Sequence, residues 1–128
     1  LKYLIAIADN GLNITAAAER LITSENVVAI MGADCSGVTG AILANVAVPN
    51  GVVMISPSAT SPALSTAEDN GLFFRTAPSD ARQGVVMAEI LLEQGRGDEA
   101  RRAWEQLLAQ YPDYLFIDDV RDDLRAMP

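Results

Sequence analysis

Two short polar segments of this 128-residue chain carry side chains that could bind a charged ligand. Residues 32–36 (GADCS) follow the apolar run VVAIM, and residues 56–60 (SPSAT) begin at the last residue of the run VVMIS. The first leads into a predicted helix, whose amino-terminal N–H groups and dipole favour an anion such as a carboxylate. Ser36 adds its hydroxyl. The second offers carbonyls and the Thr60 hydroxyl, acceptors suited to an ammonium group. Together they meet the requirements of a zwitterion.

Both segments also have an ordinary structural interpretation. Ser and Thr before helices are commonly caps, and a Ser/Pro cluster after a strand is commonly a turn. Pattern alone leaves these two interpretations open. A phosphate loop over residues 32–39 is rejected, because Val38 stands where its lysine should be and Asp34 would repel phosphate. The glycines do not follow GxGxxG either, so a dinucleotide site has no support.

The sequence offers few residues suited to catalysis. The chain has no histidine and one cysteine, Cys35, which removes the Ser-His-Asp and Cys-His arrangements and an intrachain disulfide. We therefore expect no enzymatic activity, no cofactor and no metal. Asp34 and Cys35 are interpreted as structural, Arg75 as a partner for a carboxylate or a backbone carbonyl, and Trp104 as a core residue.

Four short apolar runs have the length of β-strands, the first two that of buried parallel strands: residues 3–8, 27–31, 52–56 and 73–76. Helical patterns separate them. Ser79 or Asp80 caps the last of these helices, which runs to about Gln94 and ends at Gly95. Strands alternating with helices predict βαβ units and a parallel sheet with helices on its faces.

The two earlier helices have recognisable ends. Asn13 caps the first, and Ser36 or Thr39 opens the second, which Pro49 stops. The apolar face of the first comprises Ile14, Ala17, Ala18, Leu21 and Ile22, and that of the second comprises Val38, Ala41, Ile42 and Val46.

Charge is distributed unevenly along the chain. The net charge is -8, and the last 36 residues carry 14 of the 26 charged side chains. Acidity argues against nucleic acid and anionic membranes as partners. The composition changes near residues 93–97, and the tail beyond predicts two helices: one begins near Asp98 and ends by Pro112, and the other carries Ile117, Val120, Leu124 and Met127 at helical spacing.

Three longer stretches resemble a known family: VVAIMGADCSGVTGAI, GVVMISPSATSPALS and FFRTAPSDARQGVVMAEIL. They are similar to the amino-terminal lobe of type I periplasmic solute-binding proteins, in particular the branched-chain amino acid (leucine, isoleucine, valine) group of ABC importers. The resemblance covers about residues 3–94. It implies that Ser36 binds the ligand carboxylate, that Ser58 (carbonyl) and Thr60 (hydroxyl) receive the ammonium group, and that Ala59 lies in the pocket wall.

The chain departs from that family in two respects. The first strand and the second lobe, which closes over the ligand, have no counterpart here. The tail GRGDEARRAWEQLLAQYPDY instead resembles one tetratricopeptide-type helix pair. We therefore predict two domains. Residues 1–94 form a partial solute-binding lobe of α/β class with a three-layer parallel sheet, and residues 95–128 form a tail of two helices.

The expected function is binding of a small amino acid for an ABC importer and its membrane permease, with affinity weak or lost because the closing contacts are missing. The resemblance implies a periplasmic or extracellular lipid-anchored protein; no signal peptide is recognisable, and Leu1 leaves the natural start open. The alternative is a structural or protein-interaction module that can form a homo-oligomer. It would use the lobe as scaffold and the tail for packing.

Overall fold

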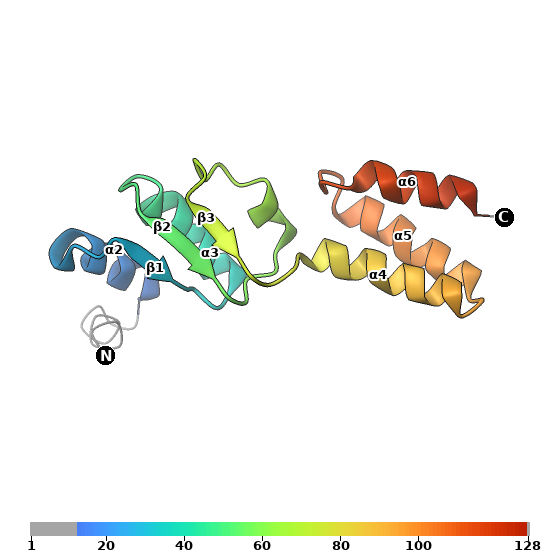
Figure 1. Ribbon diagram of the computed structural model, residues 1–128, viewed down its shortest axis with the longest axis horizontal. Helices are drawn as coiled ribbons and strands as arrows, with labels where there is room; N and C mark the ends of the chain where they lie inside the picture. Colours follow the sequence, from blue (N-terminus) through green and yellow to red (C-terminus); the bar gives the residue numbers. More distant parts are fainter. Residues whose placement is uncertain (1–12, 128) are drawn as a thin grey trace. The chain divides into compact units, whose positions relative to one another are not determined.

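The computed structural model describes residues 13–127, and the chain divides into two compact units. Unit 1 comprises Leu1–Ala59 and Ala67–Ala77, and unit 2 comprises Thr60–Thr66 and Pro78–Pro128. Figure 1 shows the strands in the first unit and a set of neighbouring helices in the second. The predicted strand at residues 3–8 lies outside the described residues.

Unit 1 contains a parallel sheet of three described strands. They are β1 (Ala29–Met31), β2 (Val53–Ser56) and β3 (Phe73–Arg75), in the order β1-β2-β3. Both pairs are parallel, with Ile30 opposite Met54 and Met54 opposite Phe73. All three strands lie within the ranges that the sequence predicted, so the α/β class and the parallel sheet are confirmed.

Helix α2 (Ile14–Glu25) precedes β1. The Asn13 side chain caps it by accepting a hydrogen bond of 3.1 Å from the Ala16 N–H, as predicted. Asn26 ends it in the left-handed conformation, with φ of 52°. Ala17, Ala18, Leu21 and Ile22 are buried as predicted, whereas Ile14, also expected on this face, is partly exposed.

Helix α3 (Ser36–Ile42) connects β1 to β2 and continues as a π-helical stretch, η1 (Leu43–Ala47). It begins at Ser36, but Cys35 occupies the cap position and gives no side-chain hydrogen bond. Ile42 and Val46 are buried as predicted. Leu43 and Ala47 are buried as well, because with Ile42 and Val46 they follow the i, i+3, i+4 spacing of one helix face.

The two faces of the described sheet differ in burial. Met54, Ser56 and Phe73 share one face and are buried, and η1 contacts β2. On the opposite face Met31 is 79% exposed and Phe74 is 56% exposed. The 27–31 run is therefore not a fully buried strand. The described helices of unit 1, α2, α3 and η1, contact one another.

Unit 2 is helical. It contains α4 (Asp80–Glu93), α5 (Gly97–Gln110), α6 (Ile117–Ala126) and the short 3-10 helix η2 (Pro62–Ser65). Figure 1 shows α4, α5 and α6 as neighbours, and α5 contacts both of the others. The two helices predicted for the tail are thus confirmed as α5 and α6, with Pro112 beyond the end of α5.

The ends of α4 are those that the sequence predicted. The Ser79 hydroxyl accepts a hydrogen bond of 3.2 Å from the Ala81 N–H, and Gly95 adopts a φ of 73° just beyond the helix. The Arg96 N–H then donates to the Leu91 carbonyl at 2.9 Å. This pairing satisfies a terminal carbonyl and requires a left-handed residue, which glycine adopts without a steric penalty.

The core of unit 2 unites all three helices around Trp104, which is 1% exposed. Ala81, Val85 and Ala88 of α4 join it, together with Leu107, Tyr114 and Val120. Gly84 allows α4 and α5 to approach closely, because a Cβ there would lie 2.8 Å from the Leu107 Cδ1 atom. This packing places α4 in one core with α5 and α6. The domain boundary at residue 94 stays a prediction.

We expect Trp104→Ala to lower the free energy of unfolding by about 3–5 kcal/mol, since it empties the centre of this core. Leu115→Ala is the matched control, because Leu115 is 72% exposed. Its effect should stay within about 0.5 kcal/mol. Urea unfolding followed by circular dichroism measures both. Equal stability of the two variants would contradict the central position of Trp104.

Candidate functional site

The two polar segments predicted to bind a ligand leave the same edge of the sheet. Residues 32–36 follow β1 and residues 57–60 follow β2, and the two strands are parallel neighbours. The Gly32 N–H donates to the Ile55 carbonyl at 2.9 Å, which extends the strand pairing into the first loop. Loops at the carboxyl edge of an open parallel sheet are the usual place for ligands.

A buried set of hydrogen bonds joins the two loops. The Ala33 carbonyl accepts from the Ser56 hydroxyl at 2.7 Å and from the Thr39 hydroxyl at 3.0 Å. The Ser56 oxygen in turn accepts from the Ala59 N–H at 3.0 Å. Ser56, Thr39 and Ala59 are fully buried. Since each of these polar groups has a partner, both loops and the start of α3 are held in one arrangement.

A second contact lies nearer the surface. The Ser58 hydroxyl lies 3.1 Å from the Asp34 carbonyl and also donates to the Asp34 carboxylate. The contact brings a carboxylate beside the loop that was predicted to receive an ammonium group. It also supports the structural interpretation of Asp34, because this side chain connects the two loops.

The four predicted site residues take different positions. Ser36 is the first residue of α3, and Ser58 contacts the adjoining loop through Asp34. Ala59 is completely buried; its N–H bonds to Ser56, and its carbonyl accepts from the Arg75 Nη1 at 3.3 Å. Ala59 therefore supports the loop from inside.

Thr60 begins the segment of unit 2 that spans residues 60–66. Its carbonyl accepts from the Asp80 N–H at 2.9 Å, beside the start of α4. The predicted set is thus divided, with Ser36, Ser58 and Ala59 in unit 1 and Thr60 in unit 2. The contact of Arg75 with the Ala59 carbonyl confirms the partner predicted for that arginine.

A cavity of about 380 Å³ opens beside these loops in unit 1. Its apolar lining residues include Ile14, Met31, Val38 and Pro57, and residues 32–35 complete it. None of the four predicted residues lines it, although each loop contributes a direct neighbour of one of them. Its volume lies within the range of small-molecule sites.

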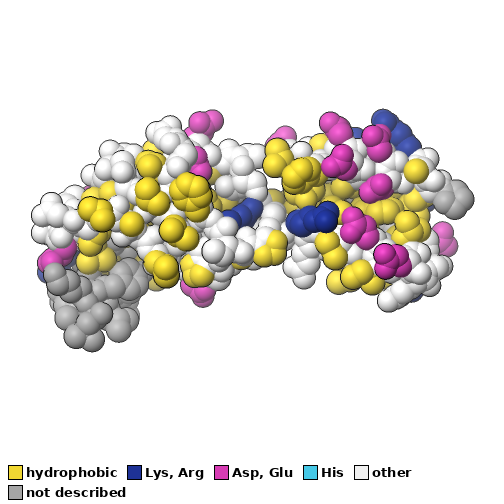
Figure 2. Space-filling model, in the orientation of Figure 1, with side chains coloured by type: hydrophobic (Ala, Val, Ile, Leu, Met, Phe, Trp, Pro, Cys, Tyr) yellow, Lys and Arg dark blue, Asp and Glu magenta, His cyan; other side chains and the backbone are white. Residues whose placement is uncertain are grey.

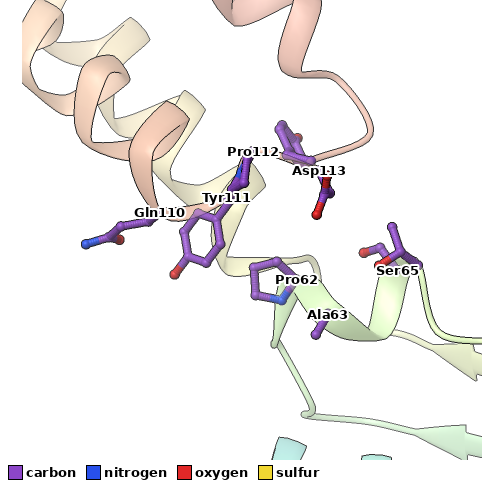
Figure 3. A pocket seen from close by; sticks show the side chains of 9 residues that line it. Pro62, Ala63, Ser65, Gln110, Tyr111, Pro112 and Asp113 are labelled. Atoms are coloured by element: carbon purple, nitrogen blue, oxygen red, sulfur yellow. The ribbon is translucent and has the colours of Figure 1, made fainter.

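Unit 2 has a separate pocket of about 210 Å³. Figure 3 shows it between the 60–66 segment and the turn after α5, with Pro62, Ala63 and Ser65 from the first and residues 110–113 from the second. The predicted ligand-binding residues do not line it. Within residues 13–127, no group of His, Cys, Asp and Glu could hold a metal ion.

Ser56 and Thr39, which join the loops, were not predicted as site residues, although their sequence positions indicate burial. Ser56 follows Met54 by two positions and so lies on the same face of β2. Thr39 precedes Ile42 by three positions and so shares the buried side of α3. The position of each hydroxyl on an apolar face indicates burial.

The comparison with known families agrees with this architecture. The profile described as "Receptor family ligand binding region" matches residues 5–95, well over half of the chain. The chain therefore belongs to that family, which is of the type I periplasmic binding protein class. The resemblance drawn from the sequence motifs is confirmed.

A curated relative matches a shorter segment. The chain is 42% identical over 74 residues to the "Chemotactic signal transduction system substrate-binding protein BasB" of Halobacterium salinarum. The aligned part is 56% of this chain and 18% of that protein, so the chain spans less than a fifth of its relative. None of the described helices is long and apolar enough to cross a membrane.

Removal of the Ser56 hydroxyl should cost more stability than removal of the Ser58 hydroxyl. Ser56→Ala leaves the buried Ala59 N–H without its partner, which costs about 1–3 kcal/mol. Ser58→Ala acts at a partly exposed position that water reaches, and should cost less than about 1 kcal/mol. Urea unfolding gives both values, and faster hydrogen exchange at the Ala59 amide in Ser56→Ala is the specific sign. An unchanged exchange rate at that amide would contradict the assigned bond.

Proposed function

We propose that this chain binds a small zwitterionic amino acid of the branched-chain type. The observation that carries the proposal is the joining of two loops at the carboxyl edge of β1 and β2, beside an apolar cavity of about 380 Å³. Membership of a ligand-binding family supports a binding role. We propose no catalytic activity, because the sequence lacks histidine and offers no nucleophile beside a base.

The charges suggest how the ligand is oriented. Ser36, in the first turn of α3, is proposed to hold the ligand carboxylate. The Ser58 carbonyl and the Thr60 hydroxyl are proposed to receive the ammonium group, and the Asp34 carboxylate, which contacts Ser58, adds a negative charge on that side. An opposite arrangement would place the ligand carboxylate against Asp34, where like charges repel.

The apolar lining suggests which side chains are accepted. Ile14, Met31, Val38 and Pro57 surround a cavity in which Asp34 is the charged side chain. A short aliphatic side chain buries apolar surface there at about 25 cal/mol per Å². A charged side chain would lose its hydration without gaining a complete set of partners.

The biological role is proposed to be capture of the ligand outside the cytoplasm, in the periplasm or on a lipid-anchored extracellular protein. The family resemblance favours delivery to the permease of an ABC importer. The name of the relative from Halobacterium salinarum, with its chemotactic signal transduction, favours delivery to a signalling receptor instead. Both roles need the same binding step.

Leucine at millimolar concentration should perturb the NMR signals of Ser36, Ser58 and Thr60, with smaller shifts elsewhere. A millimolar Kd corresponds to about -4 kcal/mol, which suits a small ligand held by a few polar contacts from these loops. Isocaproate lacks the ammonium group and leucinamide lacks the carboxylate, so each should cause weaker shifts. Unchanged spectra in the presence of leucine would remove the proposal, and equal shifts with isocaproate would remove the ammonium site.

A second candidate function is an oligomeric interaction module. The exposed sheet face, where Met31 is 79% and Phe74 56% exposed, favours this alternative. Sedimentation at several chain concentrations separates the two. The binding role predicts a monomer that responds to leucine, whereas the scaffold role predicts a concentration-dependent oligomer that does not. Met31→Ser should then restore the monomer, because it removes apolar surface from the exposed face.

A further inference from the structure

Unit 2 contains a groove that is independent of the amino-acid site. It lies between α4 and α6 and has a volume of about 460 Å³. Val85, Phe116 and Val120 provide its apolar lining. Its charged lining consists of Arg82 and of the carboxylates of Glu89, Asp119 and Asp123.

The acidic side chains of α6 are divided between paired and unpaired positions. Arg121 pairs with Asp118 at 2.7 Å, and Arg125 pairs with Asp122 at 3.0 Å. Asp119 and Asp123, which line the groove, form no ion pair within the described part of the chain. They stand four positions apart on one helix, where like charges repel and cost a few tenths of a kcal/mol. The arginines of α6 therefore leave the groove side negative.

The groove has one cation for three carboxylates. Arg82 lies 3.8 Å from Glu89, so its charge is already shared with a carboxylate of its own helix. The groove as lined thus carries a net charge of -2, from one arginine and three acidic residues. Figure 2 shows acidic side chains gathered over the helices of unit 2. A partner that fills the groove must supply positive charge.

Tyr114 adds a polar group beside these charges. Its side chain is 7% exposed, and its hydroxyl is buried without a hydrogen-bond partner among the described residues. Burial raises the pKa of Tyr114, the charge of Arg82 lowers it, and the charges of Asp119 and Glu89 raise it further. The charged side chains that act on this hydroxyl are therefore groove residues.

Phe116 supplies an exposed apolar wall. It is 52% exposed and lies edge-on to the Tyr114 ring, with 5.8 Å between ring centroids and 71° between ring planes. A half-exposed aromatic ring beside unpaired carboxylates suits a ligand that has an apolar part and a cation. A lysine or arginine side chain provides both, since its stem covers apolar surface and its charge can lie over a ring.

We propose that the groove between α4 and α6 binds a basic peptide segment of a partner protein, in which lysine or arginine alternates with apolar residues. Charge complementarity selects this occupant over a second copy of the chain. Residues 78–128 hold eleven acidic and six basic side chains, a net charge of -5, and the whole chain has -8. Two copies would bring like-charged surfaces together.

Fluorescence anisotropy of labelled peptides with the whole chain tests the proposal. A fluorescein-labelled peptide of repeated Gly-Leu-Lys should bind, and its Gly-Leu-Glu counterpart should not. Asp119→Asn with Asp123→Asn should weaken binding of the basic peptide about tenfold at low salt. Asp118→Asn with Asp122→Asn is the matched control, because it removes the same charge from the same helix at ion-paired positions; its effect should be less than about twofold.

A second pair of variants tests the apolar wall. Phe116→Ala should weaken binding of the Gly-Leu-Lys peptide. It should leave the affinity of the Gly-Ser-Lys peptide, which binds much more weakly, unchanged. Leu115→Ala, at an exposed residue outside the groove lining, should change neither affinity. No binding of Gly-Leu-Lys, equal binding of Gly-Leu-Glu, or equal losses in the two double-asparagine variants would overturn the proposal. Because the groove and the proposed leucine site share no residue, a negative result in either experiment leaves the other intact.

Discussion

The Ala33 carbonyl is the point on which the carboxyl edge of the sheet depends. Two buried hydroxyls, from Ser56 and Thr39, donate to it. One belongs to the end of β2 and the other to α3, so a single acceptor ties a strand, a helix and the loop between β1 and α3 together. A carbonyl buried without partners would be costly, and two donors satisfy both of its lone pairs. The cavity beside Asp34 and Pro57 owes its walls to this arrangement.

The same arrangement explains why the loops can be both polar and well ordered. Ser56 accepts from the Ala59 N–H while it donates to Ala33, so its hydroxyl serves two backbone groups. The outer residue Ser58 can exchange its hydrogen-bond partner, because that partner, Asp34, is exposed to water. A rigid inner set of bonds with an adaptable outer contact is a suitable basis for a binding site.

Helix α4 belongs both to the family match and to the core of unit 2. The family match extends through it to residue 95, yet its apolar residues pack on α5 around Trp104. Gly84 permits that close contact. The remaining apolar residues of α4, among them Met87 and Ile90, stay exposed. The helix thus has one face in the core of unit 2 and a second apolar face that nothing in unit 2 covers.

The sequence by itself determined the three described strands, the long helices, the caps of α2 and α4, and the family, because these depend on local periodicity and on short motifs such as SPSAT and RTAPSD. It also placed both candidate loops at one edge, since parallel neighbours end there. Only the tertiary structure decided that Ser56 and Thr39 are inner supports, that Ala59 is buried, and that α4 packs with the tail. The physical reason is that these features rest on pairs far apart in the chain, such as Ser56 with Ala33, which no local pattern specifies.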